Sequence, residues 1–393
     1  MGGGLLQLVA YGAQDVYLTG NPQITFFKVV YRRHTNFAME SIMQTFNGTA
    51  QYGNTAYATI SRNGDLVSRA YVECTLPTPG ASNRYVEYVG LKLLKAVTIE
   101  IGGQQIDKHY SDWLYIWNEL SLPVGKKWGW NKMVGSDLPV NVGSKLYIPL
   151  EFWFCRNVGL ALPLIALQYH EVKLKIEFES KANCVGGSTR GGAPTNVAGV
   201  GDLTDVNLWV DYIYLDTDER RKFAQLSHEY LIEQLQFTGS EEFKPRLKLN
   251  FNHPCKELIW VGKNDNTAAA SLMGKWTQYS NGALTNSFNT GLLQLNGNDR
   301  FAVRDASYFN LVQPYQHHTN IPSNKGINVY SFALKPEEHQ PSGTLNMSRI
   351  DTAVLSCGSS SAQKTNMEFI NVYAVNYNVL RILSGMGGLA YSN

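Results

Sequence analysis

Hydrophobic and polar residues alternate along several short segments of the chain, with the period of two that is typical of β-strands. In residues 172–179 each hydrophobic residue is followed by Lys or Glu, and residues 246–251 repeat the pattern with Arg, Lys and Asn at the polar positions. This alternation predicts strands with one buried and one solvated face. Four further segments are apolar on both faces and predict central strands: 147–154, 206–215, 326–334 and 369–383.

The N-terminal residues 8–36 combine three patterns. A stretch of mostly small and apolar residues carries no charged side chain before Asp15, a turn signal follows at Gly20-Asn21-Pro22, and an apolar run extends over residues 24–31 before a basic triplet. Pro and Gly mark turns, and a β-rich apolar run that follows a turn predicts a strand. We therefore expect a loose arm, a turn and then the first long strand of an all-β domain.

One segment near the middle of the chain predicts a helix. In residues 216–226, Asp216 stands at the expected N-cap and Glu219 follows three positions later, which is the capping-box pattern. This segment separates two β-rich halves, so we expect it to connect two domains. Two other stretches predict exposed loops, namely the Gly-rich residues 184–201 and the residues 263–292, which are rich in Asn, Thr, Ser and Gly.

The two halves resemble each other weakly. Residues 99–104 and 293–298 each consist of a strand pattern followed by a Gly turn, and an aromatic cluster follows each of them, at residues 110–113 and 307–309. This similarity suits two copies of one β fold. A β-rich chain with two equivalent halves predicts two sandwiches side by side.

Composition supports this interpretation. A chain of 393 residues is long enough for two or three domains, and its hydrophobic fraction of 44% is enough for sizeable cores. Aromatic residues make up 12% and charged residues only 17%, which favours strands and a surface largely covered by partners. The net charge of +2 is too small to indicate nucleic-acid binding.

The cysteines and the N-terminus bear on where the chain folds. The five cysteines are widely spaced without a CxxC pair, so we expect reduced thiols and folding in a reducing compartment. Residues 1–4 lack the basic start of a signal peptide, and the sequence contains no apolar run long enough to cross a membrane. Gly2 invites N-myristoylation, but Leu6 stands where that motif has Ser or Thr.

Four segments together resemble the double jelly-roll major capsid proteins of nucleocytoplasmic large DNA viruses. They are residues 8–36, 215–234, 300–347 and 373–393, in that order along the chain. The resemblance implies an all-β fold of two consecutive eight-stranded antiparallel jelly-roll sandwiches with short connecting helices. The implied division is an N-terminal arm (1–23), a first jelly roll (24–215), a helical linker (216–228) and a second jelly roll with a C-terminal tail (229–393).

The resemblance also implies a structural function. Three subunits would form a pseudo-hexagonal capsomer, and capsomers would tile the icosahedral capsid of a virion assembled in the host cytoplasm. The expected partners are other copies of the chain, minor capsid and penton proteins and, by analogy for the arm, the inner viral membrane. Direct nucleic-acid binding, a cofactor and enzymatic activity are not expected. A merely disordered terminus is an equally good interpretation of the arm from sequence alone.

Two other classes of function have candidate residues. A cupin-like metal enzyme would use some of five residues: His317, His318, Glu337, Glu338 and His339. Adjacent histidines on a strand point to opposite faces, so at most one of His317 and His318 could serve, and loop histidines bonded to the backbone are the simpler interpretation.

Carbohydrate chemistry is the other alternative. The carboxylates Asp107, Asp112 and Glu119 lie near aromatic residues, as in sugar hydrolysis, but exposed loop carboxylates are the far commoner interpretation. The tryptophans at 113, 117, 128 and 130 could stack on sugars, although packing in a core or a subunit interface is the preferred interpretation. Asn47 and Asn346 stand in glycosylation sequons, which we expect to be unused without a signal peptide. No catalytic, cofactor-binding or metal-binding residue is predicted.

Overall fold

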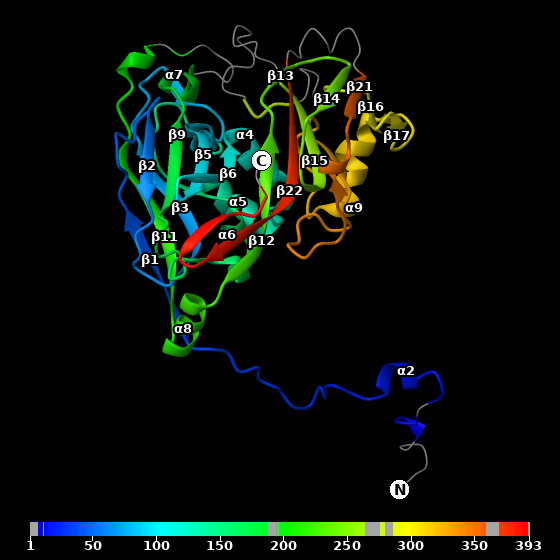
Figure 1. The fold of residues 1–393 in the computed structure, drawn as a ribbon. Helices are drawn as coiled ribbons and strands as arrows, with labels where there is room; N and C mark the ends of the chain where they lie inside the picture. Colours follow the sequence, from blue (N-terminus) through cyan, green and yellow to red (C-terminus); the bar gives the residue numbers. More distant parts are fainter. Residues whose placement is uncertain are drawn as a thin grey trace. The chain divides into compact units, whose positions relative to one another are not determined.

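The computed structural model describes residues 7–10, 12–187, 194, 196–263, 276–279, 286–358 and 369–391. The chain divides into two units, an arm (Met1–Asn36) and a body (Phe37–Asn393), which are described separately (Figure 1). In the described part of the chain, no helix is both long enough and apolar enough to span a membrane.

Among its described residues, the arm contains the short helix α2 (Val16–Thr19), and residues 20–36 form turns and extended chain. The predicted strand over residues 24–31 is wrong. These residues form no strand, and their apolar side chains are exposed, among them Phe26, Phe27 and Tyr31. A β-rich sequence becomes a strand only where a neighbouring strand supplies backbone partners. The first segment with such a partner is β1 (Phe37–Gln44), which pairs with β11 (Thr204–Leu215) along its whole length.

The first half of the body is a sandwich of two antiparallel sheets. One has the order β1-β11-β3-β7, with β3 (Leu66–Leu76), β7 (Ser144–Pro149) and a short β8 (Leu162–Pro163) paired with β3. The other has the order β2-β9-β5-β6, with β2 (Thr55–Thr59), β9 (Val172–Phe178), β5 (Leu94–Ile101) and β6 (Gln104–Tyr110). A small ladder joins β4 (Asn83–Tyr85) to β10 (Val185–Gly187). The helices of this half are α3 (Val89–Leu93), α4 (Ser111–Ser121), α5 (Val124–Met133), α6 (Trp153–Arg156), η1 (Val158–Leu160), α7 (Lys181–Cys184) and η2 (Val197–Gly199).

The second half repeats this architecture. Its first sheet has the order β12-β22-β15-β19, with β12 (His228–Phe237), β22 (Phe369–Leu383), β15 (Pro254–Lys263) and β19 (Asn328–Ser331). Its second sheet has the order β14-β21-β16-β17, with β14 (Arg246–Leu249), β21 (Ala353–Gly358), β16 (Thr290–Leu295) and β17 (Asn298–Asp299). Short strands β13 (Glu241–Glu242), β18 (Arg304–Asp305), β20 (Leu345–Asn346) and β23 (Met386–Leu389) extend the sheets, and the helices are η3 (Tyr308–Val312), α9 (Gln313–His317) and η4 (Met347–Arg349).

The two halves match strand by strand. In chain order, the first, eighth, third and sixth of the eight main strands form one sheet of each half, and the second, seventh, fourth and fifth form the other. This is the strand order of a jelly roll, so the predicted all-β fold with two jelly rolls is confirmed. Figure 1 shows the two sandwiches side by side, with helix α8 (Thr217–Gln225) at one end of the body.

The weak similarity between residues 99–104 and 293–298 corresponds to equivalent hairpins in the two halves. Gly102 and Gly103 turn between β5 and β6, and Asn296 and Gly297 turn between β16 and β17, all four with positive φ. A two-residue turn with positive φ at both positions is the type I′ turn of tight hairpins, which favours Gly and Asn. The predicted helix near residue 216 is confirmed as α8, and the Asp216 carboxylate accepts a hydrogen bond from the backbone N–H of Glu219.

Three of the strand predictions are confirmed over most of their length, and the others only in part. The segments at 172–179, 206–215 and 369–383 correspond to β9, β11 and β22, whereas 246–251 and 326–334 contain the shorter β14 and β19. The segment 147–154 is a strand only to Pro149 and then a turn of helix, α6. There Trp153 and Phe154 pack edge to face at 5.2 Å between ring centroids, so burial is achieved by aromatic packing without an extended backbone.

The two predicted loops are also partly wrong. Residues 184–187 are buried, because β10 pairs with β4 and Cys184 lies in the core. In the other stretch, Tyr279 and Phe288 are buried and β16 begins at Thr290. Residues 188–193, 195, 264–275 and 280–285 of these stretches lie outside the described residues.

The core explains why β15 and β22 are apolar on both faces. In β22, Val372 and Ala374 face the interior of the second sandwich, whereas Tyr373 and Val375 join the core of the first half. In β15, Trp260 likewise faces the interior of the second sandwich, and Ile259 joins the core of the first half. One face of the sheet β12-β22-β15-β19 therefore fills its own sandwich, and the other face, its outer face, packs against the first jelly roll.

Candidate functional site: polar contacts between the two jelly rolls

Helix α4 is one of the elements of the first half that pack on the second half, together with β6 and α6. All but its last residue are buried. Trp113 and Trp117 stack at 5.6 Å, and Trp113 lies 5.7 Å from the Tyr373 ring of β22. The preferred interpretation of these two tryptophans as core residues is confirmed, and Trp130 is buried as well. Trp128, on α5, is the exception, with 77% of its surface exposed.

Asp112, in the first turn of α4, binds two residues of the second half. Its carboxylate lies 2.5 Å from Lys263 Nζ and accepts a 2.8 Å hydrogen bond from the Tyr279 hydroxyl. Burial alone raises the pKa of this carboxyl, but the charges of Lys263 and Lys92 and the two hydrogen bonds outweigh it and hold the pKa below its usual value. Asp112 is thus an ionised structural bridge.

The other two carboxylates proposed for sugar hydrolysis have the same role. Asp107 accepts a 3.1 Å hydrogen bond from the backbone N–H of Leu235 in β12, and His109 Nε2 lies 2.9 Å from its other oxygen. Glu119 pairs with Lys127 at 3.0 Å and accepts a 2.9 Å hydrogen bond from Ser323 of the second half. Each of the three is buried and bonded to the second half. The structure therefore places them as buried bridges between the halves, which contradicts both the interpretation as exposed loop carboxylates and the hydrolysis hypothesis.

Three of the five residues proposed for a metal, His317, Glu338 and His339, are held by separate partners. His317 Nδ1 lies 3.0 Å from the backbone oxygen of Leu334, as the simpler interpretation predicts. Glu338 pairs with Lys335, and His339 Nδ1 lies 3.5 Å from Glu233. Over the residues that the structure describes, no cluster of three or more His, Cys, Asp or Glu is arranged to hold a metal ion.

The interpretation as a loop histidine bonded to the backbone is wrong for His318, because two carboxylates hold its ring. Its ring is fully buried, with Nε2 2.8 Å from Glu257 and Nδ1 2.8 Å from Glu337. Burial alone lowers the pKa of an imidazole, but the charge of Glu257 and the hydrogen bonds to both carboxylates outweigh it and raise the pKa of His318 to about 9. The ring is therefore an imidazolium that donates from both nitrogens, and it has no lone pair for a metal.

Glu233 on β12 is the centre of a second charged cluster. It accepts from the buried Lys256 Nζ at 2.8 Å and from Arg156 Nη1 at 3.0 Å. Burial alone raises the pKa of Glu233, but the contact with His339 and the charges of Lys256 and Arg156 bring it to about 2. Arg156 comes from α6 and lies over the Trp117 ring, so this cluster also joins the two halves.

Next to this cluster is a pocket at the boundary of the two halves. Its lining comes from α6, η1 and the second half: Trp153, Arg156, Asn157, Val158, Leu160, Glu233, Glu337 and His339. Its polar groups include both members of the Arg156–Glu233 ion pair. We therefore assign it to the interdomain contact.

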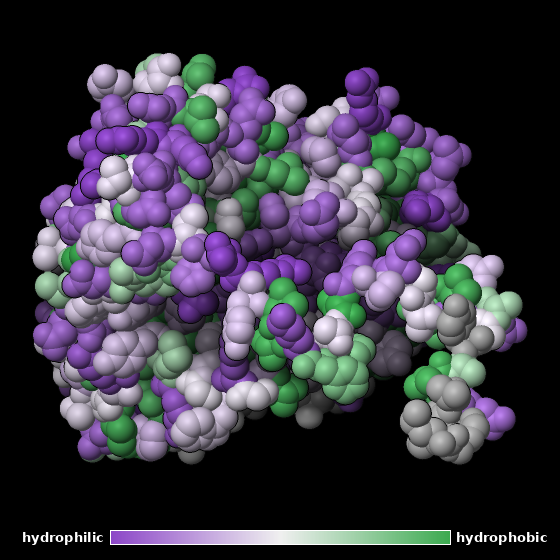
Figure 2. Space-filling model, turned by 90° about the horizontal axis from the view of Figure 1, so that it is seen from below, coloured by the Kyte–Doolittle hydropathy of each residue, from purple (hydrophilic) through white to green (hydrophobic). Residues whose placement is uncertain are grey.

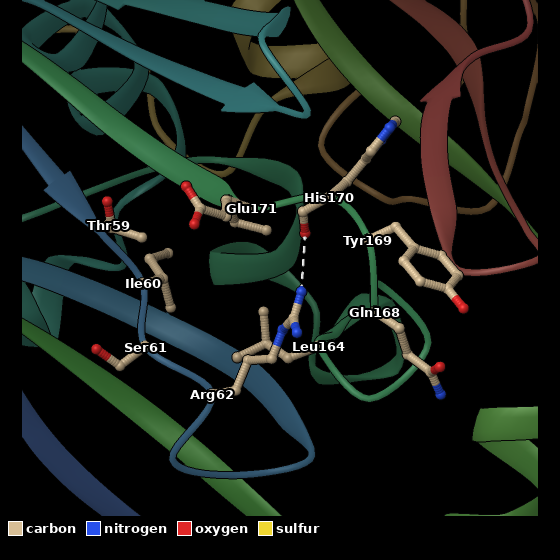
Figure 3. A pocket seen from close by; sticks show the side chains of 10 residues that line it. Thr59, Ile60, Ser61, Arg62, Leu164, Gln168, Tyr169, His170 and Glu171 are labelled. Carbon is tan, nitrogen blue, oxygen red and sulfur yellow. Dashed lines mark hydrogen bonds between the residues drawn. The ribbon is translucent and has the colours of Figure 1, made fainter.

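A second pocket lies where the C-terminal hairpin meets the first half (Figure 3). Arg62 points to backbone oxygens, donating to Leu167 at 2.6 Å and to His170 at 3.4 Å. His170 Nδ1 lies 2.9 Å from the Gly387 oxygen of β23, and the Tyr169 N–H donates to Gly385. Tyr169 and His170 therefore fasten the hairpin β22–β23 to the first jelly roll, whereas Arg62 bonds within the first half.

Sequence reasoning missed Glu233, Lys256 and Glu257. A signal was present, because Lys256 and Glu257 interrupt the otherwise apolar strand β15, and a charged pair within a buried strand requires partners. The sequence alone could not identify those partners, which lie on β12, on α6 and at His318 directly after α9.

Two family models and several known proteins are similar to this chain over nearly its whole length. The family model described as "Major capsid protein N-terminus" matches residues 25–216, and the model "Large eukaryotic DNA virus major capsid protein" matches residues 219–388. The major capsid protein of Pyramimonas orientalis virus is 54% identical and that of Paramecium bursaria Chlorella virus 1 is 48% identical, each alignment covering 100% of both chains.

Solved structures agree. Vp54 of PBCV-1 has a TM-score of 0.81 at 43% identity, with 94% of this chain and 100% of Vp54 covered. The Faustovirus major capsid protein has a TM-score of 0.78 at 15% identity, covering 95% and 94% of the two chains, which shows a shared fold.

Proposed function

We propose that this chain, which belongs to the family of large eukaryotic DNA virus major capsid proteins, assembles as a homotrimer into a pseudo-hexagonal capsomer. The chain is a structural component of the capsid. The observation that carries the proposal is the strand-by-strand match of the two halves, because three copies of a chain with two equivalent sandwiches present six similar blocks. Six similar blocks suit tiling of an icosahedral shell, and a closed ring is a common way to bury subunit surface.

The halves must be held at a fixed angle for such a block to tile, and the contacts described above supply this rigidity. The bridges from Asp107, Asp112 and Glu119 and the Arg156–Glu233 pair cross from one jelly roll to the other. We propose a structural role for these buried polar groups in place of a catalytic one. The division into a first and a second jelly roll around α8, near residues 24–215 and 229–393, remains our proposal for the domains.

The arm supports a proposal about further partners. Residues 8–31 expose many large apolar side chains, and Phe27 is 98% exposed. Leaving so much apolar surface in water is unfavourable, which indicates a partner in the assembled particle. We propose neighbouring subunits or the inner viral membrane for this role. Minor capsid and penton proteins would complete the shell.

We propose assembly in the host cytoplasm. The five cysteines support this, because all of them are free thiols and four are buried. Burial raises the pKa of the Cys74, Cys155 and Cys357 thiols to about 12, so they stay protonated and unreactive.

Light scattering after size exclusion tests the homotrimer. The expected mass is about three times the 43.9 kDa of the subunit. A stable monomer at high protein concentration would contradict the proposal and favour a binding module with the same fold.

A further inference from the structure

Strand β1 forms an exposed edge of the first jelly roll. It stands at the end of the sheet order β1-β11-β3-β7, so among the described residues no strand lies along its other edge. Its side chains are also exposed, with Met39 at 50% and Met43 at 45%. The edge strands of natural proteins are usually short, bulged or interrupted by Lys or Pro, which prevents pairing with another chain.

These protective features are absent from β1. It pairs with β11 over all eight of its residues without a bulge, and its sequence contains neither Lys nor Pro. Its one charged residue, Glu40, accepts a 3.3 Å hydrogen bond from the Tyr214 hydroxyl and forms no ion pair within the part of the chain that the structure describes. Such an edge can accept a further strand through its backbone groups.

The arm contains a segment that suits this role. Residues 24–31 are rich in β-branched and aromatic side chains, and all of them are exposed, Phe26 at 90% and Phe27 at 98%. Seen from below, the molecule mixes hydrophilic residues with separate groups of hydrophobic ones (Figure 2). Scattered apolar residues are normal on a protein surface, whereas a continuous exposed apolar run indicates a partner.

The arm segment and β1 match each other residue by residue. Both contain eight residues, so an antiparallel alignment over the full length leaves no residue unpaired. This alignment places Lys28, the one charged residue of segment 24–31, opposite Glu40, and opposite charges on facing residues stabilise paired strands. The apolar residues also face one another, Phe26 opposite Ile42 and Val29 opposite Met39.

Other alignments are less favourable. A shift by one residue puts Lys28 opposite Met39 or Ser41 and exchanges the two faces of the added strand. A shift by two residues leaves two residues of each strand unpaired. Ile42 packs against the core of the first half, so the full-length alignment also brings Phe26 to the edge of this core.

The connection between the arm segment and β1 favours pairing with a second copy. Residues 32–36 contain neither Gly nor Pro, and they form no turn in the structure. A hairpin between residues 24–31 and β1 of the same chain would need a turn within this connection. Exchange of the segment between two copies needs no turn, and a short connection is where such exchange occurs.

We infer that residues 24–31 of one copy add to the open edge of β1 in a neighbouring copy, as an antiparallel strand with Lys28 opposite Glu40. The added strand supplies the backbone partners that a β-rich segment requires, and it covers the exposed edge. The inference rests on the proposed contact between the arm and neighbouring subunits, and it identifies the strand that receives the arm.

Disulfide crosslinking of the full-length protein tests this alignment. Val29→Cys and Met39→Cys are combined in one chain, because facing residues of paired strands lie close enough for a disulfide. Val29→Cys with Met43→Cys is the matched control, since Met43 is similarly exposed on the same face of β1 but lies about 13 Å further along the strand. Diamide serves as the thiol oxidant, and each single variant alone controls for the five native cysteines.

The expected products of Val29→Cys with Met39→Cys are multiples of the 43.9 kDa subunit mass on a denaturing gel without reductant, whereas the control pair stays at the subunit mass. Co-expressed copies that carry one substitution each should also crosslink, because the bond then joins two chains. A disulfide within one chain, no disulfide at this pair, or equal crosslinking of the control pair would each overturn the inference.

Charge reversal is a second readout. Lys28→Glu or Glu40→Lys, added to the cysteine pair, places like charges opposite each other and should lower the crosslinked fraction several-fold. The two reversals together restore opposite charges and should restore the crosslinked fraction. Circular dichroism establishes that each variant is folded. A double reversal that crosslinks no better than the single ones would contradict the alignment of Lys28 with Glu40.

Light scattering of the protein before oxidation separates this inference from the proposed homotrimer. A trimer that does not crosslink at this pair would overturn the inference and leave the homotrimer standing. Crosslinked chains in an assembly of another size would support the arm contact and contradict the homotrimer. A monomer that does not crosslink would contradict both.

Discussion

At the residue scale, two buried cations of the second jelly roll, Lys256 and His318, are compensated by carboxylates of the same half. Lys256 has 1% of its side chain exposed and is neutralised by Glu233. His318 is enclosed by Glu257 and Glu337. Removing one member of a buried pair costs more than the pair contributes, because the remaining charge stays without compensation.

Glu233→Gln should therefore destabilise the protein strongly. It leaves Lys256 and Arg156 near a neutral amide, and we expect a loss of about 3–5 kcal/mol in the free energy of unfolding. Glu229→Gln is the control on the same strand, since Glu229 and its partner Arg381 are largely exposed. The control should lose less than about 1 kcal/mol. Urea unfolding measures both values, and equal losses would contradict the assigned role of Glu233.

His318 should make stability depend on alkaline pH. Its pKa is about 9 in the folded protein and 6.5 in the absence of partners, so its stabilisation is complete below pH 6.5 and disappears as pH rises through 9. The amount lost over this window is on the order of 3 kcal/mol. Thermal melting from pH 6 to pH 10 should show a falling melting temperature, and His318→Gln should remove much of this fall. The neighbouring variant His317→Gln should keep it.

Sequence patterns predicted elements with one buried face better than elements that are buried on all sides. The alternation in residues 172–179 and the cap at Asp216 gave correct elements because one strand or one helix turn determines them. Helix α4 was missed because it is buried on nearly every side and shows no polar stripe. Residues 24–31 have a strand-like sequence, but no strand among the described residues pairs with them.

The hairpin between β5 and β6 allows a prediction at the element scale. Gly102 and Gly103 both have positive φ, but a Cβ on Gly103 would meet no atom within 4 Å, whereas one on Gly102 would lie 2.4 Å from His170 Nδ1. Gly103→Ala should cost about 1 kcal/mol for its backbone conformation alone.

Gly102→Ala should cost at least about 1 kcal/mol more than Gly103→Ala, since displacing His170 also disturbs its contact with Gly387. Denaturant unfolding of both variants measures the difference. Similar losses would show that the β5–β6 turn does not depend on its contact with the His170 loop.

The body of the molecule consists of two halves with the same strand order. Sequence patterns indicated two similar halves from the Gly turns at 102–103 and 296–297. They could not indicate how the halves meet, because that contact joins residues as distant as Asp112 and Lys263. The sequence therefore offered Asp107, Asp112 and Glu119 only as carboxylates near aromatic residues, with no catalytic residue predicted, and it could not show that they bridge the halves.

Electron cryo-microscopy of the purified assembly is the most direct test of the central claim that three copies of the chain build one capsomer. We predict a particle of three chains whose six similar sandwiches form a pseudo-hexagonal ring. A particle with another number of chains, or one whose sandwiches do not form such a ring, would contradict the account.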